Sequence, residues 1–115
     1  MKTLFLSLLV ALTCSTASAA DRAGAFQGRL VKGGGADAVS VTVMTDKGEQ
    51  IFAYCGQHCG DLFSEPDKYD VVTLRKKLIG KRVAIDVTVE RNRGRIPGPD
   101  DDETIPLVKR ITLLK

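Results

Sequence analysis

Residues 78–90, LIGKRVAIDVTVE, contain the clearest β-strand signal in this 115-residue chain. From residue 83 onward, every second residue is a branched apolar residue, and the residues between them are alanine, aspartate, threonine and glutamate. Alternation with a period of two places the apolar side chains on one face of a sheet. The stretch therefore predicts a half-buried strand over residues 83–90.

Three stretches nearer the N-terminus also predict strands. Residues 26–32 form the first, which ends at the three glycines 33–35, where positive φ angles are freely available. Residues 39–44 alternate valine with polar residues or methionine and form the second. The Asp-Lys-Gly turn at 46–48 then predicts a hairpin with residues 51–55.

The interval between the third strand and residue 83 carries the signals of a helix. Residues 64–67, Ser-Glu-Pro-Asp, have the pattern of a capping box with proline in the first turn. Val71, Leu74 and Leu78 follow at spacings of three and four, and Gly80 would end the helix. We therefore expect one helix packed against the sheet by an apolar stripe.

A polar loop over residues 92–105 leads to the last predicted strand. This loop carries glycine, proline and the acidic run Asp100–Glu103. The final strand, residues 107–114, has two sets of alternating residues. One set is Leu107, Lys109, Ile111 and Leu113, and the other is Val108, Arg110, Thr112 and Leu114.

The element order is three strands, one helix and two strands. This order, with Leu78-Ile79-Gly80-Lys81-Arg82-Val83 opening the fourth strand and Val108-Lys109-Arg110-Ile111 in the fifth, resembles the OB-fold. The chain is similar to small exported bacterial OB domains and to the anticodon-binding-like branch of that fold. The resemblance implies an all-β, five-stranded Greek-key barrel with one helix between the third and fourth strands. An SH3-like barrel or another small β-barrel is the alternative.

The first nineteen residues have the composition of a secretory signal peptide. Lys2 supplies a positive n-region, residues 4–12 an apolar h-region, and Ala17-Ser18-Ala19 the small-x-small cleavage pattern. We therefore expect cleavage near Ala19 or Ala20 and a periplasmic or secreted mature protein.

The same region argues against a membrane anchor. An apolar run of about ten residues is too short to cross a bilayer, which needs about 20, so we expect no transmembrane segment after processing. Cys14 follows Thr13, with Ala11 three places before it, which fits a lipoprotein signal poorly. The mature chain, residues 20–115, is then one small domain. Loss of Lys2 leaves 16 basic against 14 acidic side chains, a balance that supports no strong polyanionic partner.

Cys55-Gly-Gln-His-Cys59 is the densest cluster of reactive residue types, and three interpretations are open. In an oxidising compartment, Cys55 and Cys59 are the only mature cysteines and would form a structural disulfide. Alternatively, Cys55, His58 and Cys59 could hold Cu(I) or Zn(II), although zinc normally takes four ligands and the chain has no second histidine. The third interpretation is a redox-active thiol pair, with one residue more than the C-x-x-C spacing.

A basic cluster raises the possibility of single-stranded nucleic-acid binding, which OB barrels often perform. Its members are Arg75, Lys76, Lys77, Lys81 and Arg82. Such grooves need exposed aromatic residues, and only Phe52 and Tyr54 share a strand face on which bases could stack. We favour a solvated helix face for the cluster, since export removes the usual nucleic-acid partners.

A single histidine without a second base argues against nucleophilic catalysis, so we expect a non-enzymatic binding module that needs no cofactor. The OB resemblance implies ligand contact on the second and third strands and on the loops at 33–37 and 93–103. The candidate ligand-binding residues are Gly33, Gly34, Gly35, Phe52, Tyr54, Arg93, Arg95, Asp101 and Asp102. The ligand could be a protein, a peptide, a glycan or a small molecule.

Overall fold

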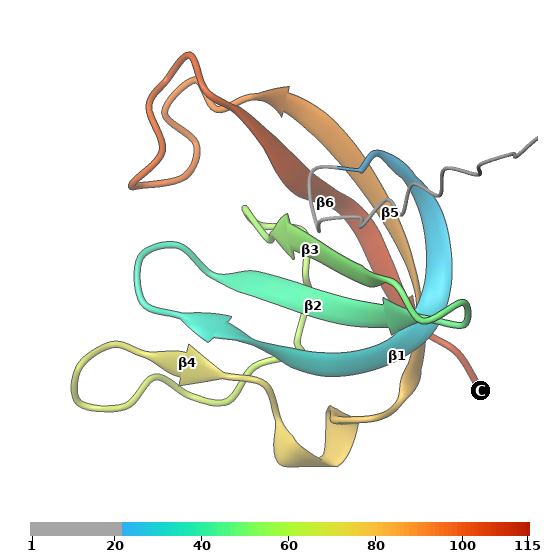
Figure 1. Ribbon diagram of the computed structural model, residues 1–115. Coiled ribbons are helices and arrows are strands. Elements are labelled where there is room, and N and C mark those ends of the chain that lie inside the picture. The colour runs from blue at the N-terminus through green and yellow to red at the C-terminus, as the bar shows by residue number, and fades with distance from the viewer. Residues whose placement is uncertain (1–21) are drawn as a thin grey trace, which may run out of the picture.

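The alternating stretch forms the long strand β5 (Arg82–Arg91), one of five strands that close a barrel (Figure 1). The computed structural model describes residues 22–115 of the chain. The other elements are β1 (Gly24–Gly35), β2 (Ser40–Thr45), β3 (Gln50–Tyr54), β4 (Val72–Thr73), a 3₁₀ turn η1 (Lys76–Leu78) and β6 (Thr104–Leu113). The barrel strands follow the order β1-β2-β3-β6-β5 and return to β1. Only the pairing of β3 with β6 is parallel. The predicted all-β barrel is confirmed, and its topology is compatible with an OB-like fold.

Strand β1 closes the barrel because its two halves pair with different neighbours. Residues 24–29 pair with β5, and residues 28–34 pair with β2. The register shifts between Leu30 and Lys32, which marks a bulge where the strand bends from one partner to the next. At Gly28, strands β1 and β2 approach so closely that a Cβ atom added to this glycine would lie 2.0 Å from the Met44 carbonyl oxygen. Only glycine fits at that point of closure.

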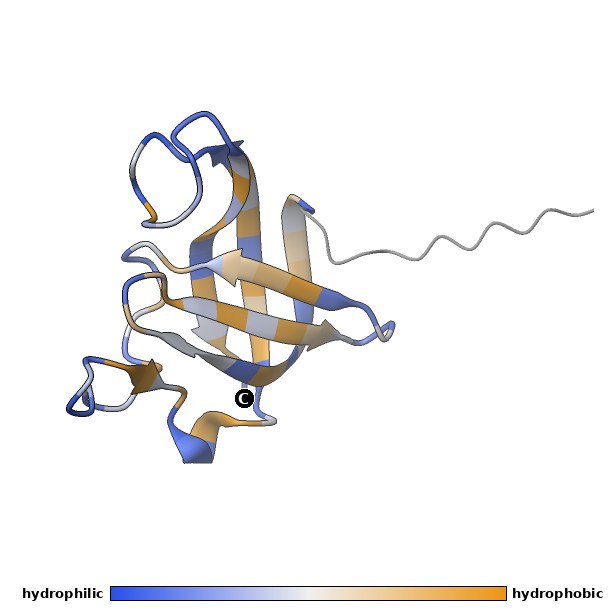
Figure 2. Ribbon diagram, turned by 60° about the vertical axis from the view of Figure 1, so that its left-hand side comes forward, coloured by the Kyte–Doolittle hydropathy of each residue, from blue (hydrophilic) through white to orange (hydrophobic). Residues whose placement is uncertain are grey.

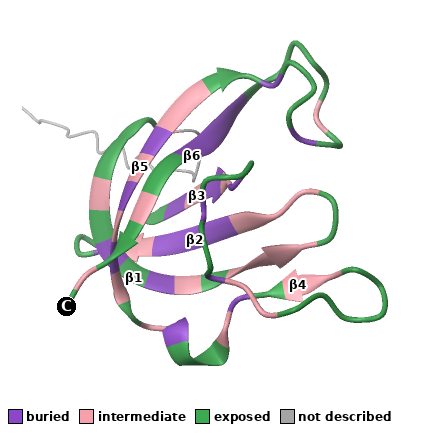
Figure 3. Ribbon diagram, turned by 180° about the vertical axis from the view of Figure 1, so that it is seen from behind, coloured by how far each residue is buried: buried purple, intermediate pink, exposed green. Residues whose placement is uncertain are grey.

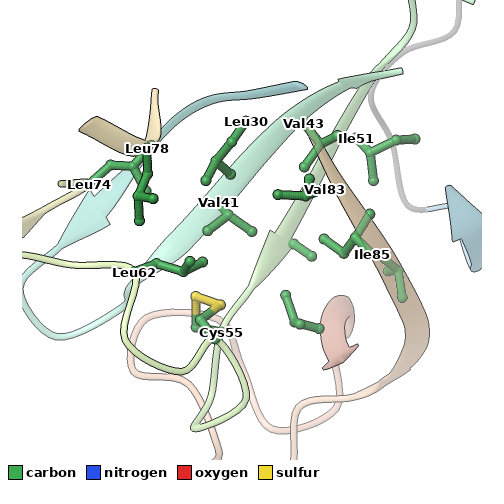
Figure 4. Packing of buried hydrophobic residues seen from close by; sticks show 14 residues of the cluster. Leu30, Val41, Val43, Ile51, Cys55, Leu62, Leu74, Leu78, Val83 and Ile85 are labelled. Carbon is green, nitrogen blue, oxygen red and sulfur yellow. A yellow bond between two sulfur atoms is a disulfide. The ribbon is translucent and has the colours of Figure 1, made fainter. Parts of the chain in front are cut away.

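The barrel interior is filled by one continuous apolar cluster (Figure 4). Alternate residues of β2 and β5 point inward, as their period of two predicts, and Figure 2 shows the same alternation of hydrophobic and hydrophilic residues along the strands. Several core side chains of β1, β2 and β5 are essentially fully buried, namely Leu30, Val41, Val43, Val83 and Ile85. The inward-facing valines and isoleucines of the sequence thus form the core.

The predicted helix over residues 64–80 is wrong. The Asp67 carboxylate accepts hydrogen bonds from the backbone N–H groups of Tyr69 (2.7 Å) and Val71 (3.1 Å), which forms a local turn in place of a helical cap. Residues 72–73 then pair with Gly34 and Gly35 as the short strand β4 (Figure 1). Branched residues favour this extended state. The only helical element among the described residues is the turn η1.

Two of the three residues in the apolar stripe of the expected helix are nevertheless buried. Leu74 and Leu78 both enter the core, where Leu62 joins them. Extended chain and a 3₁₀ turn therefore cover this end of the barrel in place of the expected helix. The pattern identified two core residues correctly, whereas Val71 is only half-buried, and the spacing did not reflect a helix.

Strand β6 also departs from simple alternation. Asp86 pairs with Arg110 and Val87 pairs with Val108, so Lys109 is an extra residue in a bulge. Val108 is buried in the core and Ile111 packs against it, although the two belong to opposite sets of the predicted alternation. One inserted residue therefore exchanges the two faces of the strand halfway along its length.

The predicted signal peptide, residues 1–19, lies outside the described residues. Within residues 22–115, no helix has the length and apolar character needed to cross a membrane.

Candidate functional site

The sequence Cys55–Cys59 forms a closed loop directly after β3. The two cysteines are disulfide-bonded, with Cα atoms 5.3 Å apart, which confirms the predicted pairing. The backbone N–H of His58 donates to the Cys55 carbonyl at 2.8 Å, so the loop is also a hydrogen-bonded turn. Both cysteines are buried, at 4% and 5% exposure, and belong to the core cluster (Figure 4). The loop is therefore anchored to the barrel by its sulfur atoms.

The buried, bonded state of Cys55 and Cys59 disfavours the metal and redox interpretations of the cluster. The sulfur atoms lie among core side chains while His58 is exposed, and the disulfide leaves no thiolate as a ligand in this state. Among residues 22–115, no group of three or more His, Cys, Asp or Glu side chains is placed to hold a metal ion. Thiol exchange requires access of a second thiolate to a sulfur atom, which burial here restricts.

The loop between β5 and β6 is organised by one buried polar side chain. Asn92 is fully buried, and its side-chain N–H₂ group donates to the carbonyls of Ile96 and Pro99, both at 2.8 Å. Its side-chain oxygen accepts from the Ile96 backbone N–H at 2.7 Å. Both N–H groups of the amide and one of the two lone pairs of its oxygen are thereby used. The loop backbone is wrapped around the Asn92 side chain.

Ile96 lies at the centre of a second, smaller apolar cluster. It packs with Ile105 and Leu107 of β6, and Ala38 and Tyr54 contact the same cluster. Tyr54 and Leu107 are register partners in the parallel β3–β6 pair. The β5–β6 loop therefore covers part of the barrel's outer surface, where the sequence pattern indicates only a polar loop.

Arg95 is held in this loop by three acceptors. Its Nη1 atom lies 3.0 Å from a Glu90 carboxylate oxygen, its Nε donates to the Asn92 carbonyl at 3.1 Å, and its Nη2 donates to the Arg91 carbonyl at 2.6 Å. A side-chain hydrogen bond from Thr88, followed by the one from Arg95, lowers the pKa of the Glu90 carboxyl. Glu90 is therefore a carboxylate at neutral pH and fixes one corner of the guanidinium.

A cleft of about 510 Å³ lies between the disulfide loop, the outer face of β5 and β6, and Arg95. We call it the Arg95 cleft. Its lining includes Gln57, His58, Glu90, Arg95, Leu107 and Lys109. The cleft is thus lined by two loops and by the outer face of the sheet. These elements bring together the imidazole of His58, the carboxylate of Glu90 and the cations of Arg95 and Lys109.

A second cleft of about 350 Å³, the glycine cleft, lies where β1 meets β2 and β4. Gly33–Gly35 line it, together with Phe52 and the segment 71–73. The Phe52 ring meets Tyr54 edge to face, with centroids 5.1 Å apart and planes at 81°. Since Tyr54 packs against the Ile96 cluster, the two aromatic residues connect the glycine cleft to the covered part of the outer surface.

The structure brings some of the predicted binding residues together and separates others. Gly33, Gly34, Gly35 and Phe52 share the glycine cleft, whereas Arg95 lines the other. Arg93, Asp101 and Asp102 are exposed on the β5–β6 loop and line neither cleft.

The sequence patterns did not identify Glu90, Asn92 and Lys109 as residues of the candidate site. A signal existed only for Asn92, which directly follows a strand, because asparagine side chains commonly organise turns.

The basic cluster is dispersed. Arg75 pairs with Asp61 at 2.6 Å and Arg82 pairs with Asp46 at 2.7 Å, both on the surface. Lys76 and Lys77 are exposed on η1. Two of the five cations are thus neutralised by carboxylates.

No protein-family model, curated protein or solved structure matches this chain. The chain is a small closed β-barrel, compatible with an OB-like fold, and carries a disulfide-bonded loop directly after β3.

Proposed function

We propose that the protein is an exported, non-enzymatic binding module that holds its ligand on the outer surface of the barrel. The observation that carries the proposal is the pair of clefts. Phe52 lines the glycine cleft and contacts Tyr54, and Tyr54 packs against the Ile96 cluster, whose Leu107 lines the Arg95 cleft. Concave sites with apolar walls and a few polar groups are typical of ligand binding.

Rigidity of the walls supports the same proposal. The disulfide holds one loop, and Asn92 holds another. Walls that are fixed before the ligand arrives reduce the entropy that binding must overcome.

The binding test is a thermal-shift screen of small molecules, peptides and glycans, since a ligand that binds only the folded state raises the unfolding temperature. The affinity of any ligand found is then measured for Phe52→Ala, in the glycine cleft, and for the combined loop variant Arg93→Ala, Arg95→Ala, Asp101→Ala and Asp102→Ala, which removes the guanidinium of the Arg95 cleft. We expect one or both variants to lose about tenfold in affinity, which equals about 1.4 kcal/mol. Unchanged affinity in both folded variants would contradict the proposed surface.

The export test is the intact mass of the protein isolated from the periplasm of a bacterial host without reductant or chelator. We expect a chain that begins near residue 20, two hydrogens lighter than the reduced form and resistant to alkylation under denaturing conditions. Retention of residues 1–19 would argue against export. Two free thiols with a bound metal would instead make Cys55, His58 and Cys59 a metal centre.

A further inference from the structure

We propose that the Arg95 cleft binds a small organic anion through a carboxylate or phosphate group. This inference deepens the proposed binding function and rests on it. Three segments far apart in sequence supply the polar walls, and a separate local feature positions each one: the disulfide, the β6 bulge and the hydrogen bonds of Asn92.

Lys109 is the cation that the bulge presents. As the extra residue opposite the Asp86–Val87 step, it is exposed and lines the cleft, whereas Arg110 beside it pairs with Asp86. Bulges commonly redirect a side chain next to a binding site. Lys109 belongs to none of the ion pairs found within residues 22–115, so its ammonium group is available to a ligand.

Arg95 supplies a second, preorganised donor. A guanidinium carries five N–H groups, and the three contacts with Glu90, Asn92 and Arg91 leave others unused. Those contacts also hold the planar group in one orientation. An anion can therefore accept from Arg95 without a further ordering cost in that side chain.

The disulfide loop completes the wall with two further polar side chains, Gln57 and His58. The disulfide and the His58-to-Cys55 backbone hydrogen bond restrain the backbone that carries them. An amide N–H₂ and an imidazole N–H both donate to anionic oxygens.

Charge and size decide the ligand class. The charged side chains that line the cleft are two cations, Arg95 and Lys109, and one carboxylate, Glu90, so their charges sum to a positive value. The acidic run 100–103 lines no part of it. Leu107 contributes an apolar floor, and about 510 Å³ lies within the usual range for small-molecule sites. A small anion with an apolar body fits these features.

The test is a titration of the ¹⁵N-labelled protein, followed by NMR, with benzoate, phenyl phosphate, benzyl alcohol and benzylammonium. We expect both anions to shift the amides of Gln57, His58 and Lys109 in preference to those of Gly33–Gly35, and to bind more tightly than the neutral and cationic analogues. A tighter interaction with benzoate or with phenyl phosphate identifies the preferred anionic group.

Lys109→Glu should weaken binding of the preferred anion by about tenfold or more, since a charge-assisted hydrogen bond is lost and a repulsive charge takes its place. Lys81→Glu, the same charge change at an exposed lysine outside both clefts, should alter affinity by no more than about twofold because distant surface charges are screened. Lys109→Gln serves as the second variant if Lys109→Glu is unfolded, and it should also weaken binding.

Three results would overturn the inference. These are equal affinity for benzyl alcohol and the anions, equal weakening by the Lys81 and Lys109 variants, and no anion-induced shift in the cleft. Equal affinity of benzyl alcohol and the anions in the Arg95 cleft would reject anion recognition alone, because a neutral ligand held there still occupies the proposed binding surface.

Discussion

Asn92 shows how a single residue can determine the shape of a loop, here the one between β5 and β6. Its buried amide makes three hydrogen bonds to the backbone of residues 96 and 99. Because the Asn92 carbonyl also accepts from Arg95, the same residue positions the guanidinium that lines the cleft. The residue thus links the local backbone to the proposed site.

Asn92→Ala should destabilise the protein by about 2–3 kcal/mol, since buried backbone groups would lose their partners. Urea unfolding measures this change. Asp102→Ala, at an exposed position of the same loop, is the control and should stay within about 0.5 kcal/mol of wild type. Equal stability of the Asn92 variant would show that water replaces the amide.

The surface pair between Asp46 and Arg82 gives a pH-dependent prediction. The hydrogen bond from Arg82 lowers the pKa of Asp46 below its ordinary value of 3.8. A lowered pKa in the folded state stabilises the protein above pH 3.8, and this contribution is lost as the pH falls through the folded-state pKa. Asp46→Asn should therefore lower the unfolding midpoint at pH 7, with the difference disappearing in strong acid.

Thermal unfolding of wild type and Asp46→Asn across this pH range makes the comparison. Added salt should reduce the difference at pH 7, because both partners are on the surface. A difference that persisted unchanged into strong acid would mean that the pair does not cause it.

Among the structural elements, the disulfide loop and the segment after it cover the end of the core that the sequence pattern assigns to a helix. Leu62, Leu74 and Leu78 fill one end of the core beside Cys55 and Cys59. The disulfide holds this irregular segment at its start, and β4 holds it further along by pairing with Gly34 and Gly35.

The double variant Cys55→Ala and Cys59→Ala should lose about 2 kcal/mol of stability, because the short cross-link no longer restricts the unfolded chain. Chemical denaturation of the oxidised protein and of the variant measures the loss. The NMR amides of Gln57 and His58 should shift most, while β2 should be unaffected. Equal stability would show that packing alone holds the loop.

At the scale of the whole molecule, the closed barrel and its surface segments differ sharply in burial (Figure 3). Leu30, Val43 and Ile85 are buried in strands paired on both sides, whereas residues 65–70 are exposed and lie outside the barrel strands. Local opening follows such differences.

Native-state hydrogen exchange should therefore be slowest for amides in β1, β2 and β5 and fastest for residues 65–70. The Ile96 amide should be slow despite its position in a loop, because it donates to buried Asn92. Exchange of Ile96 as fast as that of residues 65–70 would show that the Asn92 structure opens readily.

The sequence alone determined the features that depend on local pattern. Alternation predicted β2, β5 and β6, Asp46-Lys47-Gly48 predicted the hairpin turn between β2 and β3, and the count of mature cysteines predicted the disulfide. These signals succeed because a period of two, a turn residue and a cysteine pair each act over a few residues.

Local sequence patterns could not predict the conformation of residues 64–80, the bulge at Lys109 or the placement of Arg95. The helix signal was overridden because the edge at Gly34–Gly35, about 40 residues away, pairs with residues 72–73. The bulge depends on the register with β5, and the clefts depend on which loops the closed barrel brings together. Each of these features arises from contacts between segments distant in sequence, whose free energies exceed weak local preferences.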